Sequence, residues 1–237
     1  TTMTFQFKQF SVKQAQSAMK IGTDSVLLGA WTPIEQPQSI LDIGAGTGLL
    51  ALMLAQRSEA MTIDAVEIDE SAYIECTENF EASPWGDRLF CYHASFEEFF
   101  TEMDEPYNLI ISNPPFYPTD YKTPEKARNT ARFSEALPPK QLLEGVNRLL
   151  AVEGKFSVIL PYTESERFIT LAATFGLFPQ QITHTRGNAQ SELKRSMMLF
   201  GRASLPSYPI HILTIEKERG VYTEEYKALT KEFYLGF

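Results

Sequence analysis

The sequence predicts an α/β fold: a doubly wound, seven-stranded, mainly parallel sheet with an antiparallel hairpin at its edge and a small N-terminal extension. From residue 39 onward, short apolar runs of strand length alternate with runs of helical length, an order typical of parallel sheets. The first strand passes into a glycine-rich turn at 44–48. Near the C-terminus, two strand-like runs are separated by too few residues for a helical crossover, which favours an antiparallel pair.

The expected elements follow one another along the chain. Three phenylalanines alternate within 4–12 and predict a strand or hairpin ahead of the main domain. A short helix is expected over 24–31, with Asp24 as its N-cap. Strands are then expected at 39–46, 61–69, 88–94, 107–113 and 155–161, and helices at 48–57, 70–83, 139–154 and 164–176. The last elements are strands at 178–186, 196–204 and 209–217 and a helix at 223–235 capped by Thr223.

Length and composition restrict the class of protein. A chain of 237 residues with 43% hydrophobic and 22% charged residues suits one cored domain, with an extension over 1–31 and a core over 39–237. Two cysteines without a CxxC motif and three scattered histidines argue against a disulfide framework or a metal site. Without a long apolar run or a signal peptide, we expect a cytoplasmic protein with no membrane partner. No feature decides the oligomeric state, and a monomer is the simpler expectation.

The net charge of −9 by itself argues against a nucleic-acid partner. Its distribution weakens this objection, because 59–105 holds fourteen acidic residues and one basic residue. Basic residues gather in 1–23, in 122–132 and in 184–202. Two arrangements remain open: a molecule whose acidity is remote from its functional site, and an ordinary solvated surface.

The turn after the first strand contains Asp42, Gly44, Gly46 and Gly48. Ligands of open α/β sheets bind beyond the carboxyl ends of the strands, where glycines let the backbone come close. The spacing does not fit the dinucleotide fingerprint, because Leu49 stands where its third glycine is required. It resembles the G-x-G-x-G turn of enzymes that use S-adenosylmethionine. Asp42 then faces such a cofactor or stabilises the turn.

Glu67 lies near the end of the second strand, about twenty residues after the turn. An acidic residue at this place accepts hydrogen bonds from both hydroxyls of a ribose, in NAD and in S-adenosylmethionine alike. The alternative is a tight turn without a ligand and a solvated Glu67. Because the turn and the acid occupy the correct places of one βαβ unit, the sequence favours a cofactor site, and Leu49 disfavours NAD.

The fourth strand ends in Asn113, Pro114, Pro115, Phe116 and Tyr117. Prolines fix φ and remove backbone donors, so the segment should form a stiff loop at the strand end. The side-chain oxygen of Asn113 and the carbonyl of Pro114 can accept hydrogen bonds from an amine conjugated to a ring. Two fixed acceptors favour a pyramidal nitrogen with a free lone pair. Phe116 and Tyr117 can stack on an unstacked base, or be surface aromatics at a proline-rich strand exit.

Together these motifs resemble those of the class I S-adenosylmethionine-dependent methyltransferases that act on planar amines, a class with a Rossmann-like fold. Further segments are similar to the tRNA(Val) adenine-N6 methyltransferase family, which methylates the adenosine at position 37. They are FKQF (7–10), MKIGTD (19–24), LLGAW (27–31), LDIGAGTGLLALMLAQR (41–57), IDAVEID (63–69), SPWGDR (83–88), LIISNPPFY (109–117) and YKALTKEFYL (226–235). The resemblance implies S-adenosylmethionine as cofactor, tRNA as partner and an adenine amine as acceptor.

The resemblance also implies roles for single residues. Gly22 and Thr23 would lie over the methionine end of the cofactor. Relatives commonly place an Asp after the third strand to bind the adenine amine. Ser95 stands there in this chain, so we expect the backbone and Phe96 to hold the adenine. Arg128 and Arg132 fit a loop that anchors the substrate, or are simply solvated.

Other acceptors stay open at this point. The Asn-Pro-Pro-Phe motif also occurs in enzymes that methylate guanine N2 of ribosomal RNA, and a relative of the motif occurs in enzymes that methylate a protein glutamine. A binding module that kept the fold without catalysis is a further alternative, against which the intact Asn113 and the glycine turn argue.

Overall fold

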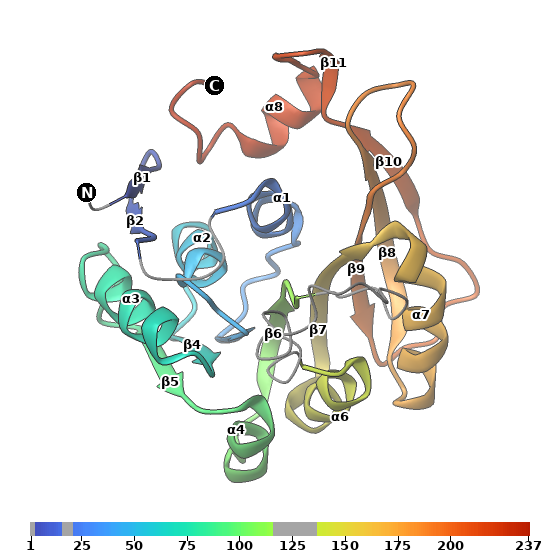
Figure 1. Cartoon of the computed structure of the whole chain (residues 1–237). Coiled ribbons are helices and arrows are strands. Elements are labelled where there is room, and N and C mark those ends of the chain that lie inside the picture. Colours follow the sequence, from blue (N-terminus) through green and yellow to red (C-terminus); the bar gives the residue numbers. More distant parts are fainter. Residues whose placement is uncertain (1–2, 16–20, 116–136) are drawn as a thin grey trace, which may run out of the picture.

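The computed structural model describes residues 3–15, 21–115 and 137–237, and one twisted sheet forms its centre (Figure 1). In the described residues this sheet has eight strands in the order β10-β8-β9-β7-β6-β3-β4-β5. The strands are β3 (Ser39–Ile43), β4 (Thr62–Glu67), β5 (Leu89–His93), β6 (Tyr107–Ser112), β7 (Leu150–Pro161), β8 (Phe178–Arg186), β9 (Arg195–Gly201) and β10 (Ile210–Thr214). All pair in parallel except β9, which is antiparallel to β7 and β8. The predicted fold class is confirmed.

The edge of the sheet differs from the sequence prediction. The strand expected over 209–217 is present as β10, but the predicted sheet has seven strands with the β8–β9 hairpin outermost, whereas β10 joins the sheet as an eighth strand outside this hairpin. Ile210 pairs with Ile182 and Thr214 with Arg186 in a parallel register. The outer backbone of β8 would otherwise be an unpaired edge, and β10 satisfies its hydrogen bonds.

Helices cover both faces of the sheet (Figure 1). On one face lie α1 (Thr23–Trp31), α2 (Leu49–Arg57), α3 (Glu70–Glu81), α8 (Glu224–Thr230) and the hairpin of β1 (Thr4–Gln6) and β2 (Ser11–Lys13). On the other lie α4 (Phe96–Glu102), α6 (Pro139–Leu149) and α7 (Ser165–Thr174). A short 3-10 helix, η1 (Tyr162–Glu164), and the strand pair β11 (Glu216–Glu218) and β12 (Val221–Tyr222) complete the described elements. Each face thus has its own buried apolar cluster.

Helix α6 ends at Leu149, not at residue 154 as the sequence predicts. Leu150 has an extended backbone, with φ −77° and ψ 126°, and pairs with Tyr107 of β6. The next residues include Val152 and Gly154, which are poor helix formers. The apolar pattern of the helix therefore continues into β7 without marking the change of structure.

The N-terminal hairpin, which the sequence predicts as a strand or hairpin, is tied to the centre of the molecule by Asn79 of α3. Its side chain is 2% exposed, accepts from the amide of Lys13 at 2.8 Å and donates to the carbonyl of Thr47 at 2.9 Å. One buried amide therefore joins the hairpin, α3 and the glycine turn.

The sheet reverses its direction of winding at β3. This strand pairs in parallel with β4 on one side and with β6 on the other. The connections leave β3 toward β4 and β5, and the chain then returns to β6 on the opposite side. The carboxyl ends of β3 and β6 therefore form the crevice in which open α/β sheets bind their ligands.

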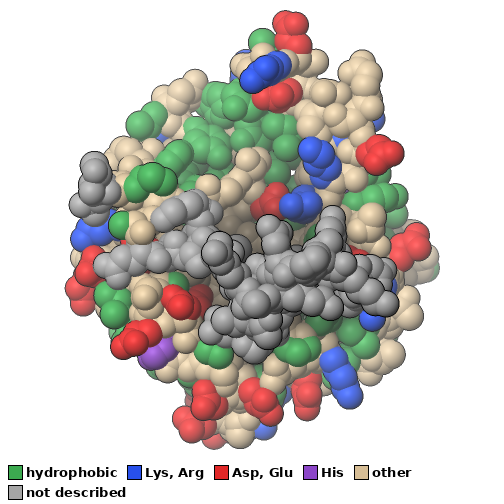
Figure 2. Space-filling model, viewed as in Figure 1, with side chains coloured by type: hydrophobic (Ala, Val, Ile, Leu, Met, Phe, Trp, Pro, Cys, Tyr) green, Lys and Arg blue, Asp and Glu red, His purple; other side chains and the backbone are tan. Residues whose placement is uncertain are grey.

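Charge is unevenly distributed over the surface. In Figure 2, acidic side chains gather over α3 and α4, the helices of the acidic run 59–105. Arg202 does not extend a basic face near the site, because it donates to the carbonyls of Asn147 and Leu150 at 2.7 and 2.8 Å. In the described part of the chain, no helix is long and apolar enough to cross a membrane.

Candidate active site at the switch point

A cavity of about 270 Å³ lies beyond the carboxyl ends of β3, β6 and β7. Its walls come from the start of α1, the turn after β3, the loop after β6, the end of β7 and Arg195 of β9. Figure 1 shows β6 ending near the middle of the molecule, below α1. Segments from residue 21 to residue 195 thus meet at the place where the strand order reverses.

The glycines of the turn serve two purposes. Gly44 and Gly46 line the cavity with φ of +70° and +55°, and a Cβ on either would meet no atom within 4 Å. Gly48 has φ +80°, but a Cβ there would lie 2.5 Å from Phe80 and 2.8 Å from Cys76 of α3. The first two glycines leave backbone open toward the cavity, whereas Gly48 lets the turn pack against α3.

Glu67 stands at the end of β4, directly behind the turn, and is 8% exposed. Its Oε2 accepts from the amide of Gly46 at 2.7 Å, and its Oε1 accepts from the amide of Asp69 at 2.9 Å. A carboxylate oxygen has two acceptor positions. Each oxygen of Glu67 therefore keeps one position for a hydroxyl donor such as a ribose.

Asp42 is fully buried beneath the same turn. Its Oδ2 accepts from the amide of Ala51 at 3.1 Å, while Oδ1 has no partner among the described residues. Burial raises the pKa of Asp42 to about 7, with the Ala51 bond opposing and the charge of Glu67 adding to the rise. A buried carboxylate with an unpaired oxygen is costly, so this arrangement fits a cationic ligand group nearby.

Asn113 reaches the cavity from the end of β6, together with Pro114 and Pro115. Its Nδ2 donates to Oγ of Ser25 in α1 at 2.8 Å. With the nitrogen of the amide engaged by α1, Oδ1 is left as the acceptor of this side chain. The stiff loop that the sequence predicts therefore presents Asn113 and Pro114 beside the glycine turn.

The start of α1 forms another part of the cavity wall, which includes Gly22. Thr23 begins the helix, is exposed and does not line the cavity. The prediction of Asp24 as N-cap is wrong: Gly22 is the N-cap residue, and no side chain caps the helix. Asp24 instead accepts from Nε of Arg195 at 2.7 Å.

Ser95 and Phe96 lie away from this cavity. Ser95 is the N-cap of α4 and forms a capping box with Glu98, whose Oε2 it contacts through Oγ at 2.8 Å. The ring of Phe96 is 6% exposed and packs against Gly145 of α6. The side chain of Phe96 is therefore part of the core, and that of Ser95 caps α4. Only the backbone of these two residues remains as a candidate for holding the adenine.

Four predicted site residues lie outside the described residues: Phe116, Tyr117, Arg128 and Arg132. Ser25, Pro161 and Arg195 are among the residues of the cavity wall that the sequence analysis did not predict as site residues. Ser25 directly follows a residue that the sequence explains as a cap, and Arg195 belongs to a strand far along the chain. No local signal marks Ser25, and only the basic run 184–202 marks Arg195. In the described residues, no group of three His, Cys, Asp or Glu side chains is placed to hold a metal ion.

These features fit S-adenosylmethionine. The amides of Gly44 and Gly46 already donate to Val66 and Glu67, which suits a ligand without phosphate. The unpaired Oδ1 of Asp42 is an acceptor suited to the cofactor's ammonium group, although Asp42 is buried behind the turn and does not line the cavity. The remaining acceptor positions of Glu67 suit its ribose. Fold and site together define a class I S-adenosylmethionine-dependent methyltransferase with an Asn-Pro-Pro loop at the fourth parallel strand.

Comparison with known proteins narrows this class. Residues 11–164 match the family model described as the Methyltransferase small domain. Proteins named tRNA1(Val) (adenine(37)-N6)-methyltransferase from Flavobacterium psychrophilum and Flavobacterium johnsoniae are 58% and 55% identical to this chain over 232 residues, 98% of the chain and 99% of each relative. The protein of that name from Photorhabdus laumondii is 40% identical over 98% of the chain and 95% of its own length. The chain belongs to the tRNA1(Val) (adenine(37)-N6)-methyltransferase family.

Solved structures support the fold alone. A predicted O-methyltransferase from Agrobacterium tumefaciens superimposes with a TM-score of 0.67 at 17% identity, over 89% of this chain and 96% of its own. A ribosomal protein L11 methylase from Lactobacillus delbrueckii gives a TM-score of 0.58 at 15% identity, over 80% and 83% of the two chains. The arrangement of the sheet is thus that of class I methyltransferases.

Proposed function

We propose that this protein transfers the methyl group of S-adenosylmethionine to the exocyclic N6 amine of adenine 37 in tRNA1(Val). The observation that carries the proposal is the meeting of the Asn113–Pro114 acceptors and the Gly44–Gly46 turn on the wall of one cavity. The two Flavobacterium relatives, 58% and 55% identical over almost the full length, carry this activity in their name.

The cofactor, when bound, supplies an electrophilic methyl group on a sulfonium sulfur. Oδ1 of Asn113 and the carbonyl oxygen of Pro114 accept hydrogen bonds from the target amine and hold its lone pair toward the cavity. Ser25 holds the amide of Asn113 from the other side at 2.8 Å. Pro114 and Pro115 keep the two acceptors fixed, so little reorganisation is needed during the reaction. No strong base is required, because the amine becomes acidic once it is alkylated.

Five residues around the turn would hold the cofactor. Gly44 and Gly46 leave room for it, and Glu67 accepts from its ribose. Asp42 faces its ammonium group, and Gly22 covers its methionine end. Gly48 supports the site indirectly by letting the turn pack on α3.

The residues that we propose to bind the substrate lie outside the described ranges. Phe116 and Tyr117 would stack on the target adenine once it leaves its loop. Enzymes that modify a base commonly hold the extruded base between aromatic or apolar side chains in this way. Arg128 and Arg132 would contact phosphates. We further propose a cytoplasmic location, with which a tRNA substrate agrees, and a monomeric protein.

The decisive experiment uses tRNA1(Val) transcribed without modifications. After incubation with the protein and S-adenosylmethionine, mass spectrometry of nuclease fragments should show one added methyl group at N6 of adenine 37. A transcript with guanine at position 37 is the matched control and should stay unmodified. A methyl group on guanine N2 of ribosomal RNA, or on a protein glutamine, would refute the proposed acceptor.

A further inference from the structure

Arg195, the first residue of β9, lies on the wall of the cofactor cavity. Its Nε donates to Oδ2 of Asp24 at 2.7 Å, and its Nη1 donates to the carbonyl of Lys194 at 3.1 Å. Nη2 has no hydrogen-bond partner in the part of the chain that the structure describes. The side chain is 39% exposed. Two contacts therefore fix the guanidinium plane while one nitrogen keeps its donors.

The charges of the cavity wall are few. Of the described residues that line it, Arg195 is the only cation and Asp24 the only anion. Asp24 follows Gly22 at the start of α1, and Arg195 pairs with Pro161 at the end of β7; Gly22 and Pro161 line the same cavity. Half-exposed ion pairs of this kind contribute little to stability, so stability alone does not explain a pair at this place.

We propose that Arg195 binds the carboxylate of the methionyl end of the cofactor, and that Asp24 is a positioning residue that orients its guanidinium. This inference rests on the proposed function only in taking S-adenosylmethionine as the cofactor. A guanidinium offers planar N–H donors that match the geometry of a carboxylate. Because Asp24 engages Nε and the carbonyl of Lys194 engages Nη1, Nη2 is the nitrogen that stays available to the ligand.

The charge of Asp24 favours an amino-acid carboxylate over an RNA phosphate as the ligand. The methionyl end is a zwitterion, so its ammonium group compensates the negative charge that the carboxylate brings toward Asp24. A phosphodiester brings negative charge alone and would be repelled by Asp24. The ion pair is thus complementary to a ligand that carries both charges.

The test compares two ligands by calorimetry: S-adenosylhomocysteine, which has the amino-acid end, and 5′-methylthioadenosine, which lacks it. Arg195→Gln should weaken binding of S-adenosylhomocysteine by about 10- to 100-fold, the usual effect of losing a hydrogen bond between charged groups. Binding of 5′-methylthioadenosine should change by less than about twofold, because the adenosine contacts stay intact. Arg195→Lys should recover part of the lost affinity.

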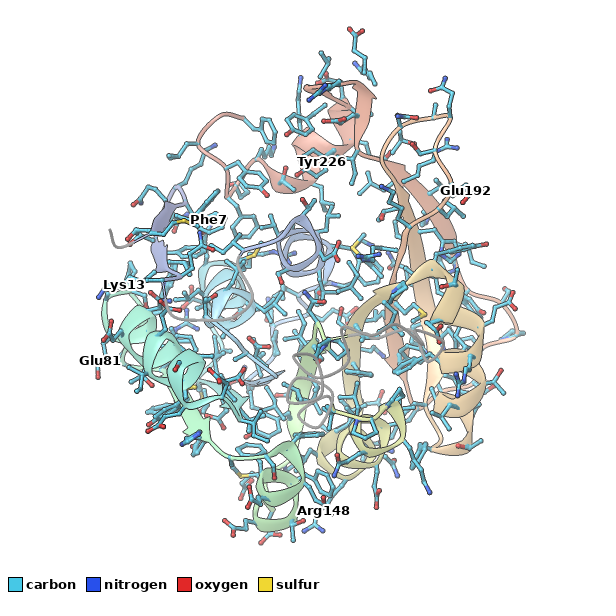
Figure 3. All side chains as sticks on the ribbon, viewed as in Figure 1. Phe7, Lys13, Glu81, Arg148, Glu192 and Tyr226 are labelled. Atoms are coloured by element: carbon cyan, nitrogen blue, oxygen red, sulfur yellow. The ribbon has the colours of Figure 1, made fainter. Side chains whose placement is uncertain are left out.

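Two controls make the result specific. Arg148→Gln removes an arginine at the far end of α6, whose Nη2 donates to the carbonyl of Thr101 at 3.0 Å (Figure 3). This variant should bind both ligands as the wild type does. Asp24→Asn should weaken S-adenosylhomocysteine less than Arg195→Gln, because it disturbs the orientation of Arg195 and not its charge.

Three outcomes would overturn the inference. Equal losses for both ligands would make Arg195 a support of the adenosine site or of the fold. Unchanged S-adenosylhomocysteine binding, with a smaller salt dependence of tRNA binding in Arg195→Gln, would assign the residue to a phosphate. A wild-type protein that binds neither ligand would refute the proposed cofactor as well. A wild type that binds both but methylates another acceptor would refute only the proposed function.

Discussion

Among single residues, Asn113 carries most of the proposed chemistry, because its amide is engaged by Ser25 on one side and faces the cavity on the other. Asn113→Ala should lower the rate of methyl transfer by about 10²–10³, the usual effect of removing one oriented acceptor or donor from a transition state. Affinity for S-adenosylhomocysteine should stay within a few-fold of wild type. Single-turnover kinetics and calorimetry measure the two quantities.

Ser25→Ala is the matched variant, since it leaves the Asn113 amide in place and removes only its partner. We expect a smaller loss of rate than in Asn113→Ala, with Ser25→Thr restoring part of it. An Asn113→Ala protein that turns over like wild type would contradict the role given to this side chain.

Asp42 predicts a pH dependence of cofactor binding. Its pKa is raised to about 7 by burial, and a bound ammonium group favours its ionised form. Binding should therefore release a proton below pH 7. Affinity for S-adenosylhomocysteine should fall by up to about tenfold per pH unit as the pH drops below 7, and level off above it. Calorimetry in buffers of different ionisation enthalpy detects the released proton.

The raised pKa of Asp42 also predicts how pH changes the free energy of unfolding of the protein without ligand. Between the ordinary pKa of 3.8 and about 7, the folded protein holds a proton that the unfolded chain has lost. The contribution of Asp42 to the free energy of unfolding therefore falls as the pH rises through this window. Asp42→Asn should flatten both dependences, and a profile unchanged by this substitution would exclude Asp42 as their source.

Among the elements, the turn between β3 and α2 shows how one motif combines packing and binding. Gly48→Ala places a Cβ 2.5 Å from Phe80 at a positive φ, and should lower the free energy of unfolding by about 2–4 kcal/mol through strain and overpacking. Gly44→Ala meets no neighbouring atom, so it should cost only about 1–2 kcal/mol of backbone strain while weakening the cofactor. Urea unfolding and calorimetry separate the two variants; equal effects on stability would contradict the distinction.

Considered as a whole, the molecule builds its cavity from segments between residues 21 and 195. A ligand there contacts both halves of the sheet, so it should stabilise the folded chain as a unit. S-adenosylhomocysteine at 100 times its Kd should add about 2.7 kcal/mol. For a chain of this length that corresponds to a rise in Tm of about 5–10 °C. Adenine alone at the same concentration is the control, and an equal rise with adenine would argue against a site that spans the two halves.

The sequence by itself determined the alternation of strands and helices, the glycine turn, Glu67 and the Asn-Pro-Pro loop. These features depend on local patterns: apolar periodicity, the φ angles open to glycine and proline, and short motifs at strand ends. A motif fixes which strand end carries a group, and the switch-point rule then brings Asn113 beside Gly44 without knowledge of side-chain contacts.

Only the tertiary structure decided what depends on residues far apart in the chain. The hydrogen bond from Asn113 to Ser25 spans 88 positions, and the ion pair of Asp24 with Arg195 spans 171. The end of α6 at Leu149 and the pairing of β10 with β8 likewise follow from partners that local propensity does not register. The core position of Phe96 follows from the glycine of a facing helix. Long-range packing assigns such side chains, because burial and hydrogen-bond satisfaction are properties of the assembled molecule.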